Sequence, residues 1–148
     1  MTLRQVESIL DGECDPVANA ANIAAVLFGM LPEVNWAGFY FLRNGELVLG
    51  PFQGQPACVR IALGNGVCGT AAQSRVTLVV PDVHAFPGHI ACDPRSRSEI
   101  VVPVVRGDVL VGVLDLDSPR EGRFSAEDRE LLERVVDAYV AASFGSLS

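Results

Sequence analysis

The spacing of apolar residues changes along the chain, from a helical period to a strand period and back. Apolar residues recur at helical spacing over residues 3–10. A second helix is predicted to open at Asp15 and Pro16, an N-cap followed by a first-turn proline, and to run to about Met30. The capping-box pattern at residues 125–128 precedes a third apolar helical face. Helices are therefore expected at both ends.

Between these helices, apolar runs bounded by turn residues predict strands. The expected strands are residues 36–42, 46–52, 57–63, 77–83, 98–105 and 109–118. A tight two-residue turn at Asn44 and Gly45 closes the first hairpin, and a second antiparallel pair meets across residues 106–108. A short helix is expected at about Val67 to Gln73. The sequence thus predicts a single α+β domain over residues 1–148, with N-terminal and C-terminal helices packed on an antiparallel sheet.

Charge and composition exclude several classes of function. The chain has 148 residues with 18 acidic and 11 basic side chains, a formal charge of −7, and all basic residues are arginine. This balance argues against a nucleic-acid partner, and the lack of lysine excludes Schiff-base chemistry and a Walker phosphate loop. No apolar stretch is long enough to span a membrane, and the first residues lack the apolar core of a secretory signal. We therefore expect a cytoplasmic protein, whose cysteines are kept reduced.

Three of the four cysteines lie in positions that favour reactivity. Cys58 and Cys68 flank glycine-rich turns, and Cys92 lies in a stretch without periodicity over residues 84–97. Cys68 is expected at the start of a helix, where the helix dipole lowers a thiol pKa. The alternative for each of these three cysteines is that it is a small buried apolar side chain. For the fourth, Cys14, this alternative is preferred.

A zinc site is a second interpretation, since three cysteines and two histidines supply enough ligands for tetrahedral coordination. The spacing argues against it. No CxxC or HxxxH pair is present, so the chelating turn that usually starts a zinc site is missing.

Acidic and aromatic residues form further candidates. Asp115 and Asp117 share one face of a strand, and Glu99 begins the neighbouring strand, so the three carboxyls can converge on one pocket. Such a cluster would bind an ammonium group, and crowding would raise one carboxyl pKa enough for proton donation. A solvated strand face is the simpler alternative. Trp36 and Tyr40 also share a strand face, and such an aromatic pair is more often part of a core than of a ligand pocket.

Taken together, these segments resemble the free methionine-(R)-sulfoxide reductases, small enzymes of the GAF fold. The resemblance runs through most of the chain, in the segments NWAGFY, LGPFQGQPACVRI, GNGVCG, VPDVHAFPGHIACDPRSRSEIVVPV and GVLDLDSP. The stretch FPGHIACD followed by SEIV is highly specific. A sensory GAF domain that binds a small ligand without catalysis is the alternative, but it would not be expected to carry cysteines at these three places.

The resemblance implies a reaction and the cysteines that perform it. Cys92 would attack the sulfur of free methionine-(R)-sulfoxide and become a sulfenic acid, and methionine would leave. Cys58 would condense with that sulfenic acid to a disulfide, which thioredoxin or a similar dithiol reopens. Cys68 matches the third cysteine of the family, as an alternative resolving or relay thiol. Cys14 lies outside the pattern and receives no role. No metal and no organic cofactor is implied.

The resemblance also places Glu99, Asp115 and Asp117 around the substrate. One carboxyl would protonate the sulfoxide oxygen while the others hold the α-ammonium, and the residues do not say which does which. Trp36 and Tyr40 match the family's pocket for the substrate methyl group. Backbone amides of the long loop would receive the α-carboxylate. A homodimer is expected from the same resemblance.

Overall fold

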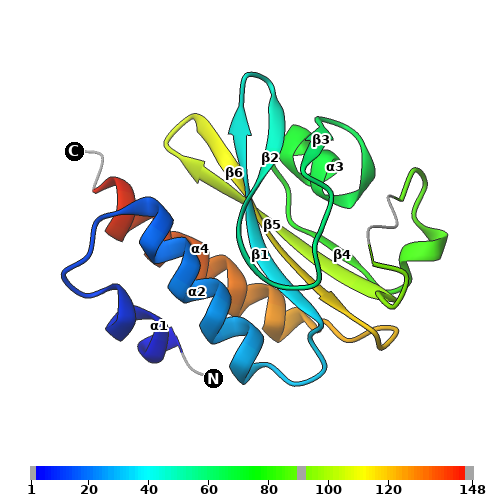
Figure 1. Ribbon diagram of the computed structural model, residues 1–148, viewed down its shortest axis with the longest axis horizontal. Helices are drawn as coiled ribbons and strands as arrows, with labels where there is room; N and C mark the ends of the chain where they lie inside the picture. Colours follow the sequence, from blue (N-terminus) through cyan, green and yellow to red (C-terminus); the bar gives the residue numbers. More distant parts are fainter. Residues whose placement is uncertain (1–2, 90–92, 146–148) are drawn as a thin grey trace.

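The computed structural model describes residues 3–89 and 93–145 of the chain (Figure 1). Helices lie at both ends and a sheet lies between them, as the sequence predicts. The elements in chain order are α1 (Leu3–Leu10), α2 (Pro16–Met30), β1 (Trp36–Arg43), β2 (Glu46–Gly54), β3 (Arg60–Ala62), α3 (Gly66–Ser74), β4 (Leu78–Val80), the 3-10 turn η1 (Val83–Ala85), β5 (Ser98–Arg106), β6 (Val109–Ser118) and α4 (Ala126–Phe144).

The strands form one antiparallel sheet in the order β3-β2-β1-β6-β5-β4. The hairpin between β1 and β2 turns at Asn44 and Gly45, whose φ angles of 51° and 82° are those of a type I′ turn. The α2 cap is also confirmed, since the Asp15 carboxylate accepts from the backbone amides of Val17 and Ala18. Ser125 caps α4 through the expected capping box. The α+β architecture predicted from the sequence is therefore confirmed.

Helices cover both faces of the sheet, and this explains the unbroken apolar strands. The helices α2 and α4 pack on one face, with α1 against them, and α3 packs on the other (Figure 1). Side chains alternate along each strand. Phe39 and Leu114 point into the core beneath α2 and α4, while Tyr40 and Val113 point into the core beneath α3. Within the described residues, every helix is too short or too polar to cross a bilayer.

Two predicted strands are shorter than expected, and proline and edge position explain both. Instead of residues 57–63, β3 covers only three residues, because it is an edge strand paired with β2 alone. Instead of residues 77–83, β4 ends at Val80, because Pro81 lacks an N–H to continue the ladder. Asp82 then caps η1 by accepting from the backbone N–H of His84.

Candidate active site

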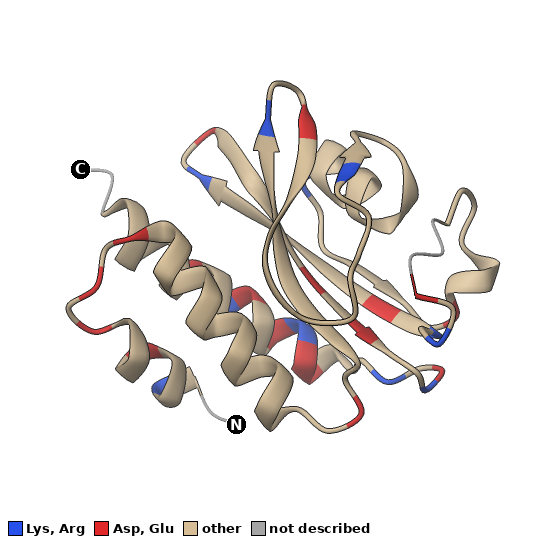
Figure 2. Ribbon diagram, viewed as in Figure 1, with Lys and Arg blue, Asp and Glu red and all other residues tan. Residues whose placement is uncertain are grey.

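The register of the three central strands places acidic and aromatic side chains in one row. Trp36 on β1 lies opposite Asp117 on β6, and Asp117 lies opposite Glu99 on β5. Asp115 lies two positions before Asp117 on β6, so its side chain points to the same face. Figure 2 shows acidic segments within β5 and β6, in the middle of the sheet. The expectation that the three carboxyls converge on one pocket is confirmed, because all three line the same cavity.

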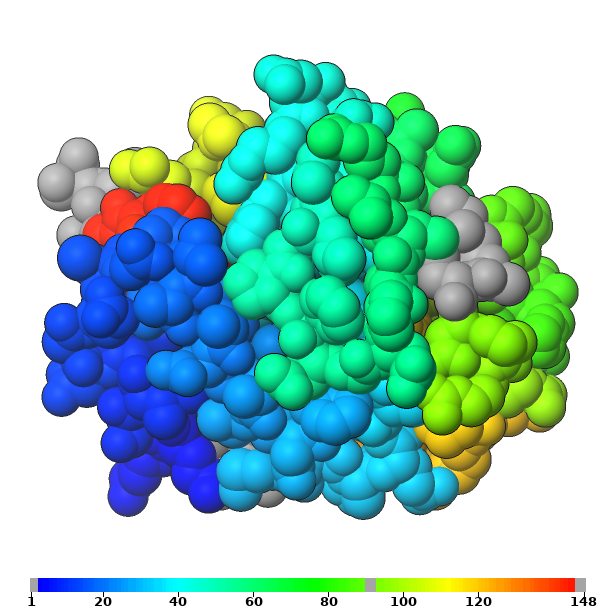
Figure 3. Space-filling model, in the orientation of Figure 1, coloured from blue at the N-terminus to red at the C-terminus, as the bar shows by residue number. Residues whose placement is uncertain are grey.

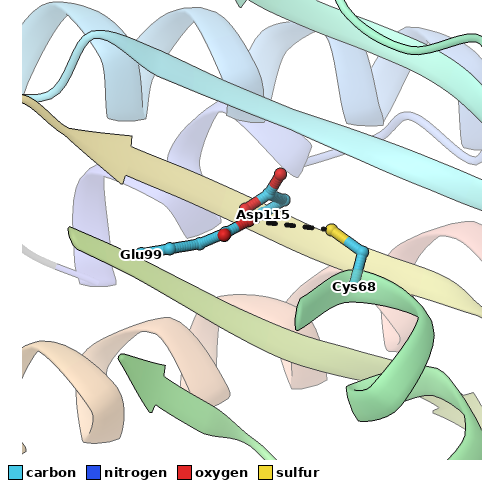
Figure 4. Close-up of side chains that lie close together, drawn as sticks. All are labelled: Cys68, Glu99 and Asp115. Carbon is cyan, nitrogen blue, oxygen red and sulfur yellow. Dashed lines mark hydrogen bonds between the residues drawn. The ribbon is translucent and has the colours of Figure 1, made fainter. Parts of the chain in front are cut away.

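The helix α3 adds Cys68 to this cluster from the layer above the sheet. The Cys68 Sγ lies 3.9 Å from Glu99 Oε2, within hydrogen-bonding distance for sulfur. Figure 4 shows the thiol pointing from the start of α3 toward Glu99 and Asp115 on the neighbouring strands. Gly69 lets the start of α3 pack closely against the end of β3, since a Cβ there would lie 2.4 Å from the Ala62 carbonyl oxygen.

Burial sets the protonation of the carboxyl cluster. Glu99 and Asp115 are only 6% and 5% exposed. Burial raises the pKa of Glu99 well above its ordinary range, and the charges of Asp115 and Asp117 raise it further. Burial, then the Asp115 charge, likewise raises the pKa of Asp117 well above its usual value. Burial raises the pKa of Asp115 too, but hydrogen bonds with Glu99 and Cys68 act in the opposite direction. The cluster therefore retains protons at a pH where exposed carboxyls have lost them.

The environment of Cys68 contradicts the expectation of an activated, accessible thiol. Its side chain is a free thiol and is buried at 5% exposure. Burial raises the Cys68 pKa well above its ordinary value, and the charges of Asp115 and Glu99 raise it further. The helix dipole does not compensate for a dehydrated thiol facing carboxylates. The expectation that Cys14 is a buried apolar side chain is also wrong, since its free thiol is exposed.

Aromatic rings form the part of the cavity lining on β1, beside the acids of β6. The Trp36 ring stacks on Tyr40, with centroids 5.9 Å apart, and on Phe52, with centroids 5.4 Å apart. Gly38 leaves room for this stack, because a Cβ there would lie 2.8 Å from Trp36 Cη2 and 2.4 Å from Phe52 Cβ. Trp36 and Tyr40 line the cavity and also belong to the core beneath α3. The core interpretation of this pair is therefore confirmed, while its role toward a ligand stays a prediction. Phe52 is a stacking partner that the sequence did not indicate.

The same aromatic residues hold the connection from β2 to β3 over the site. Trp36 Nε1 donates to the Gln55 carbonyl over 3.0 Å, and the Tyr40 hydroxyl donates to the Cys58 carbonyl over 3.0 Å. This connection lies across the visible face of the molecule in Figure 3. Pro56 and Ala57 line the cavity, and Cys58 follows them in a half-buried position.

The loop before β5 supplies polar lining residues that the sequence indicated only as a region. His89, Asp93 and Ser96 line the cavity. Asn35 Nδ2 donates to Asp93 Oδ2 over 3.3 Å and to Ser96 Oγ over 3.2 Å, which ties the loop to the start of β1. The lack of periodicity over residues 84–97 was the signal for this loop. Cys92, the predicted nucleophile, lies outside the described residues.

Three donors of the cluster are close enough to share a metal ion. One ligand atom each from Cys68, Glu99 and Asp115 lies within 4.8 Å of the others. A structural zinc site has four protein ligands, usually with at least two from cysteine or histidine. This set has a single soft donor and raised pKa values on every ligand, so protons compete with a metal there.

Comparison with known proteins assigns the fold family. The sequence model of the GAF domain family matches residues 5–142 of this chain. The chain belongs to the GAF family. Known members close to this GAF protein include the free methionine-R-sulfoxide reductase of Escherichia coli (strain K12), which is 50% identical over 133 residues, covering 90% of this chain and 81% of that protein. The protein of the same name from Saccharomyces cerevisiae is 43% identical over 141 residues, covering 90% of this chain and 78% of that protein.

Solved structures extend the likeness to three dimensions. The free methionine-R-sulfoxide reductase from Neisseria meningitidis, in complex with its substrate, superposes on this GAF protein with a TM-score of 0.94. The two are 45% identical, and the match covers 98% of this chain and 87% of that one. The GAF protein is therefore a close relative of these enzymes over nearly its whole length.

Proposed function

We propose that this chain reduces free methionine-(R)-sulfoxide to methionine. The observation that carries the proposal is the cavity itself, where three carboxyls with raised pKa values and a stacked aromatic pair line the same space. Relatives at 50% and 43% identity carry the name of this activity, and a neighbour at 45% identity was solved with its substrate. The substrate needs an acid for its oxygen, an anion for its ammonium and an apolar surface for its methyl group, and this cavity offers all three.

In this proposal Glu99, Asp115 and Asp117 divide the polar work. An ionised carboxylate holds the α-ammonium, and a protonated carboxyl donates to the sulfoxide oxygen while the sulfur is attacked. Trp36 and Tyr40 receive the methyl group, because their stacked faces are apolar and close to the acids. A general acid at neutral pH requires a raised carboxyl pKa, and burial provides it here.

We assign the redox steps to Cys92 and Cys58. The Cys92 thiolate attacks the sulfoxide sulfur, which gains two electrons. The oxygen passes to Cys92 as a sulfenic acid, and methionine leaves. The Cys58 thiol then condenses with that sulfenic acid to a disulfide and releases water, and thioredoxin or a similar dithiol returns both cysteines to thiols.

Chain connectivity supports this assignment. His89 and Asp93, on either side of Cys92 in sequence, both line the cavity, and so does Ala57, next to Cys58. Cys68 is the weaker candidate for attack, because its pKa is raised and the thiolate is the nucleophile. We therefore restrict Cys68 to a relay or alternative resolving role. The reducing conditions of the cytoplasm suit this cycle.

The test is a dithiol-driven assay on the separate R and S diastereomers of free methionine sulfoxide, with an N-acetylated, C-amidated analogue beside them. Turnover should be confined to the free R form. Cys92→Ser should abolish turnover, Cys58→Ser should still allow one cycle, and Cys14→Ser serves as the matched control with full activity. Multiple turnover by Cys92→Ser would exclude the mechanism.

Two alternatives give different outcomes of the same experiment. A sensory GAF domain would bind a small ligand without turnover in the folded, reduced protein. A metal protein would purify with near-stoichiometric metal on Cys68, Glu99 and Asp115, the donor set that lies together, and elemental analysis measures this directly.

The expected homodimer is tested by light scattering during size-exclusion chromatography.

A further inference from the structure

The connection from β2 to β3 carries Cys58 and is held in place by the strands beside it. Residues 55–59 form an irregular segment between the end of β2 and the start of β3. The Tyr40 hydroxyl donates to the Cys58 carbonyl over 3.0 Å, and the Leu49 backbone N–H donates to the Val59 carbonyl over 2.9 Å. The first of these bonds acts on the backbone of Cys58 directly.

The hydroxyl of Tyr40 is more than the methyl-binding role requires. A methyl group contacts the face of an aromatic ring, and phenylalanine would offer the same face. A buried hydroxyl costs free energy unless it finds a hydrogen-bond partner, and Tyr40 is only 2% exposed. The hydroxyl therefore needs an account of its own, and its partner is the peptide carbonyl of Cys58.

The packing around Tyr40 makes this donor rigid. Its ring stacks on Trp36 with 5.9 Å between centroids and belongs to the core beneath α3. The strand that carries it, β1, lies inside the sheet between β2 and β6. The hydroxyl is therefore a fixed point to which the irregular segment is attached.

The hydroxyl also keeps its proton. Burial raises the pKa of Tyr40 above its ordinary value, and the charges of Asp115 and Cys68 raise it further. A carbonyl oxygen only accepts, so the phenol is the donor in the bond to Cys58. This bond therefore persists when the carboxyls of the cavity gain or lose protons.

Disulfide formation demands a well-placed backbone at Cys58. In the proposed cycle the Cys58 sulfur attacks the sulfur of the Cys92 sulfenic acid. The S–S bond forms, the S–O bond breaks, and the departing hydroxide combines with the proton of the Cys58 thiol and leaves as water. A disulfide allows the two Cα atoms a separation of only about 4.4–6.8 Å. A cysteine on an untethered segment would spend less time in that geometry.

We infer that the Tyr40 hydroxyl is a positioning group, which holds the backbone of Cys58 where its sulfur can reach the sulfenic acid on Cys92. This inference rests on the proposed function. It gives Tyr40 two separable parts, a ring for the substrate and a hydroxyl for the resolving cysteine. Tyr40→Phe removes only the second part.

The test measures how fast Cys58 reacts with the sulfenic acid, independently of the first step. The reduced full chain receives one equivalent of free methionine-(R)-sulfoxide without a dithiol, together with a 1,3-diketone that traps sulfenic acids. Mass spectrometry of the digested protein then measures the trapped Cys92 and the disulfide between Cys58 and Cys92. Both products arise from the same sulfenic acid, so the trap concentration that divides the protein equally between them is proportional to the rate of attack by Cys58.

Tyr139→Phe is the matched control. Tyr139 is also a buried tyrosine whose hydroxyl donates to a backbone carbonyl, that of Pro16, over 2.9 Å. It lies in the core beneath α2 and α4, on the other face of the sheet. Access of the trap is calibrated in Cys58→Ser, with and without Tyr40→Phe, by adding the trap after the sulfenic acid has accumulated. The ratio of the two trapping rates corrects the comparison.

Tyr40→Phe should lower the trap concentration for equal division about 3- to 10-fold, the effect of losing one neutral hydrogen bond that favours the reactive geometry. Tyr139→Phe should match the wild type. An unchanged concentration in Tyr40→Phe, or an equal fall in Tyr139→Phe, would overturn the inference.

Release of methionine in the same samples separates this inference from the proposed function. If the wild type releases methionine and its Cys92 is trapped, an unchanged division in Tyr40→Phe removes this inference alone. If the wild type releases no methionine from the sulfoxide, the proposed function fails and the inference fails with it.

Discussion

Replacing Glu99 by glutamine should stabilise the ligand-free protein in a pH-dependent way. Glu99 is 6% exposed, and burial and two neighbouring carboxyls raise its pKa well above the ordinary value. In the unfolded chain Glu99 ionises near its ordinary pKa of about 4.3. The folded state therefore binds more protons above that pH, and its stability falls as the pH rises toward the folded pKa. Glutamine keeps the shape of the side chain and removes this titration.

The magnitude scales with the rise in pKa. Each pH unit by which the folded pKa exceeds the unfolded one costs about 1.4 kcal/mol once Glu99 is ionised. For a chain of 148 residues this corresponds to about 4–5 °C in Tm.

Thermal unfolding followed by circular dichroism between pH 4 and pH 8.5 measures the effect. The Tm of Glu99→Gln should equal that of the wild type near pH 4 and exceed it increasingly toward pH 8. Glu7→Gln, at an exposed position of α1, is the matched control and should show no such trend. A Tm difference that is absent at pH 8, or constant across the range, would refute the account of the buried cluster.

Three further predictions follow from the geometry. Gly38→Ala should cost about 1–3 kcal/mol of unfolding free energy by overpacking against Phe52, and an unchanged urea midpoint would contradict this. Cys14→Ser should remove one rapidly reacting thiol from a titration with a thiol reagent at pH 7.5, while Cys68→Ser should remove none, since Cys68 is buried; rapid loss with both variants would show that the α3 face opens. Ser125→Ala should lower the unfolding free energy by about 1 kcal/mol through loss of the α4 cap, and Ser125→Gly by only a few tenths.

Local sequence signals predicted the elements well where the signal is itself local. The Asp15 cap, the turn at Asn44 and Gly45 and the capping box at Ser125 each act through neighbours within a few residues, and the structure confirms all three. The extent of β3 depends instead on its partner strand. β3 stops where its pairing with β2 stops, and no pattern within residues 57–63 records that.

In the site, too, local patterns predicted some features, and contacts between distant elements determined the others. Strand alternation alone correctly placed Asp115 and Asp117 on one face, and the register then added Glu99 and Trp36 to their row. The protonation of Cys68 could not be predicted in this way. A helix start lowers a thiol pKa only where the thiol remains solvated, and the carboxyls that cover it come from strands about 30 and 50 residues away in sequence. Burial and charge from distant elements therefore decide the chemistry of this thiol.

The coupling within the cluster also predicts how the carboxyls divide their roles. Asp115 is partly relieved by hydrogen bonds that favour its charged form, while Glu99 and Asp117 are raised well above their ordinary pKa values. An entering ammonium should therefore ionise Asp115 first and leave protons on the facing pair across β5 and β6.

Asp115→Asn should then raise KM for the free sulfoxide with a smaller effect on kcat, because it weakens the ammonium contact. Asp117→Asn should lower kcat and flatten the alkaline limb of the pH profile, because it removes one of the paired proton donors. If the two variants show the opposite split, the ammonium is held by the Glu99 and Asp117 pair and the proton comes from Asp115. Since one register places all three carboxyls within a single cavity, this split in kinetics distinguishes roles that their positions alone do not.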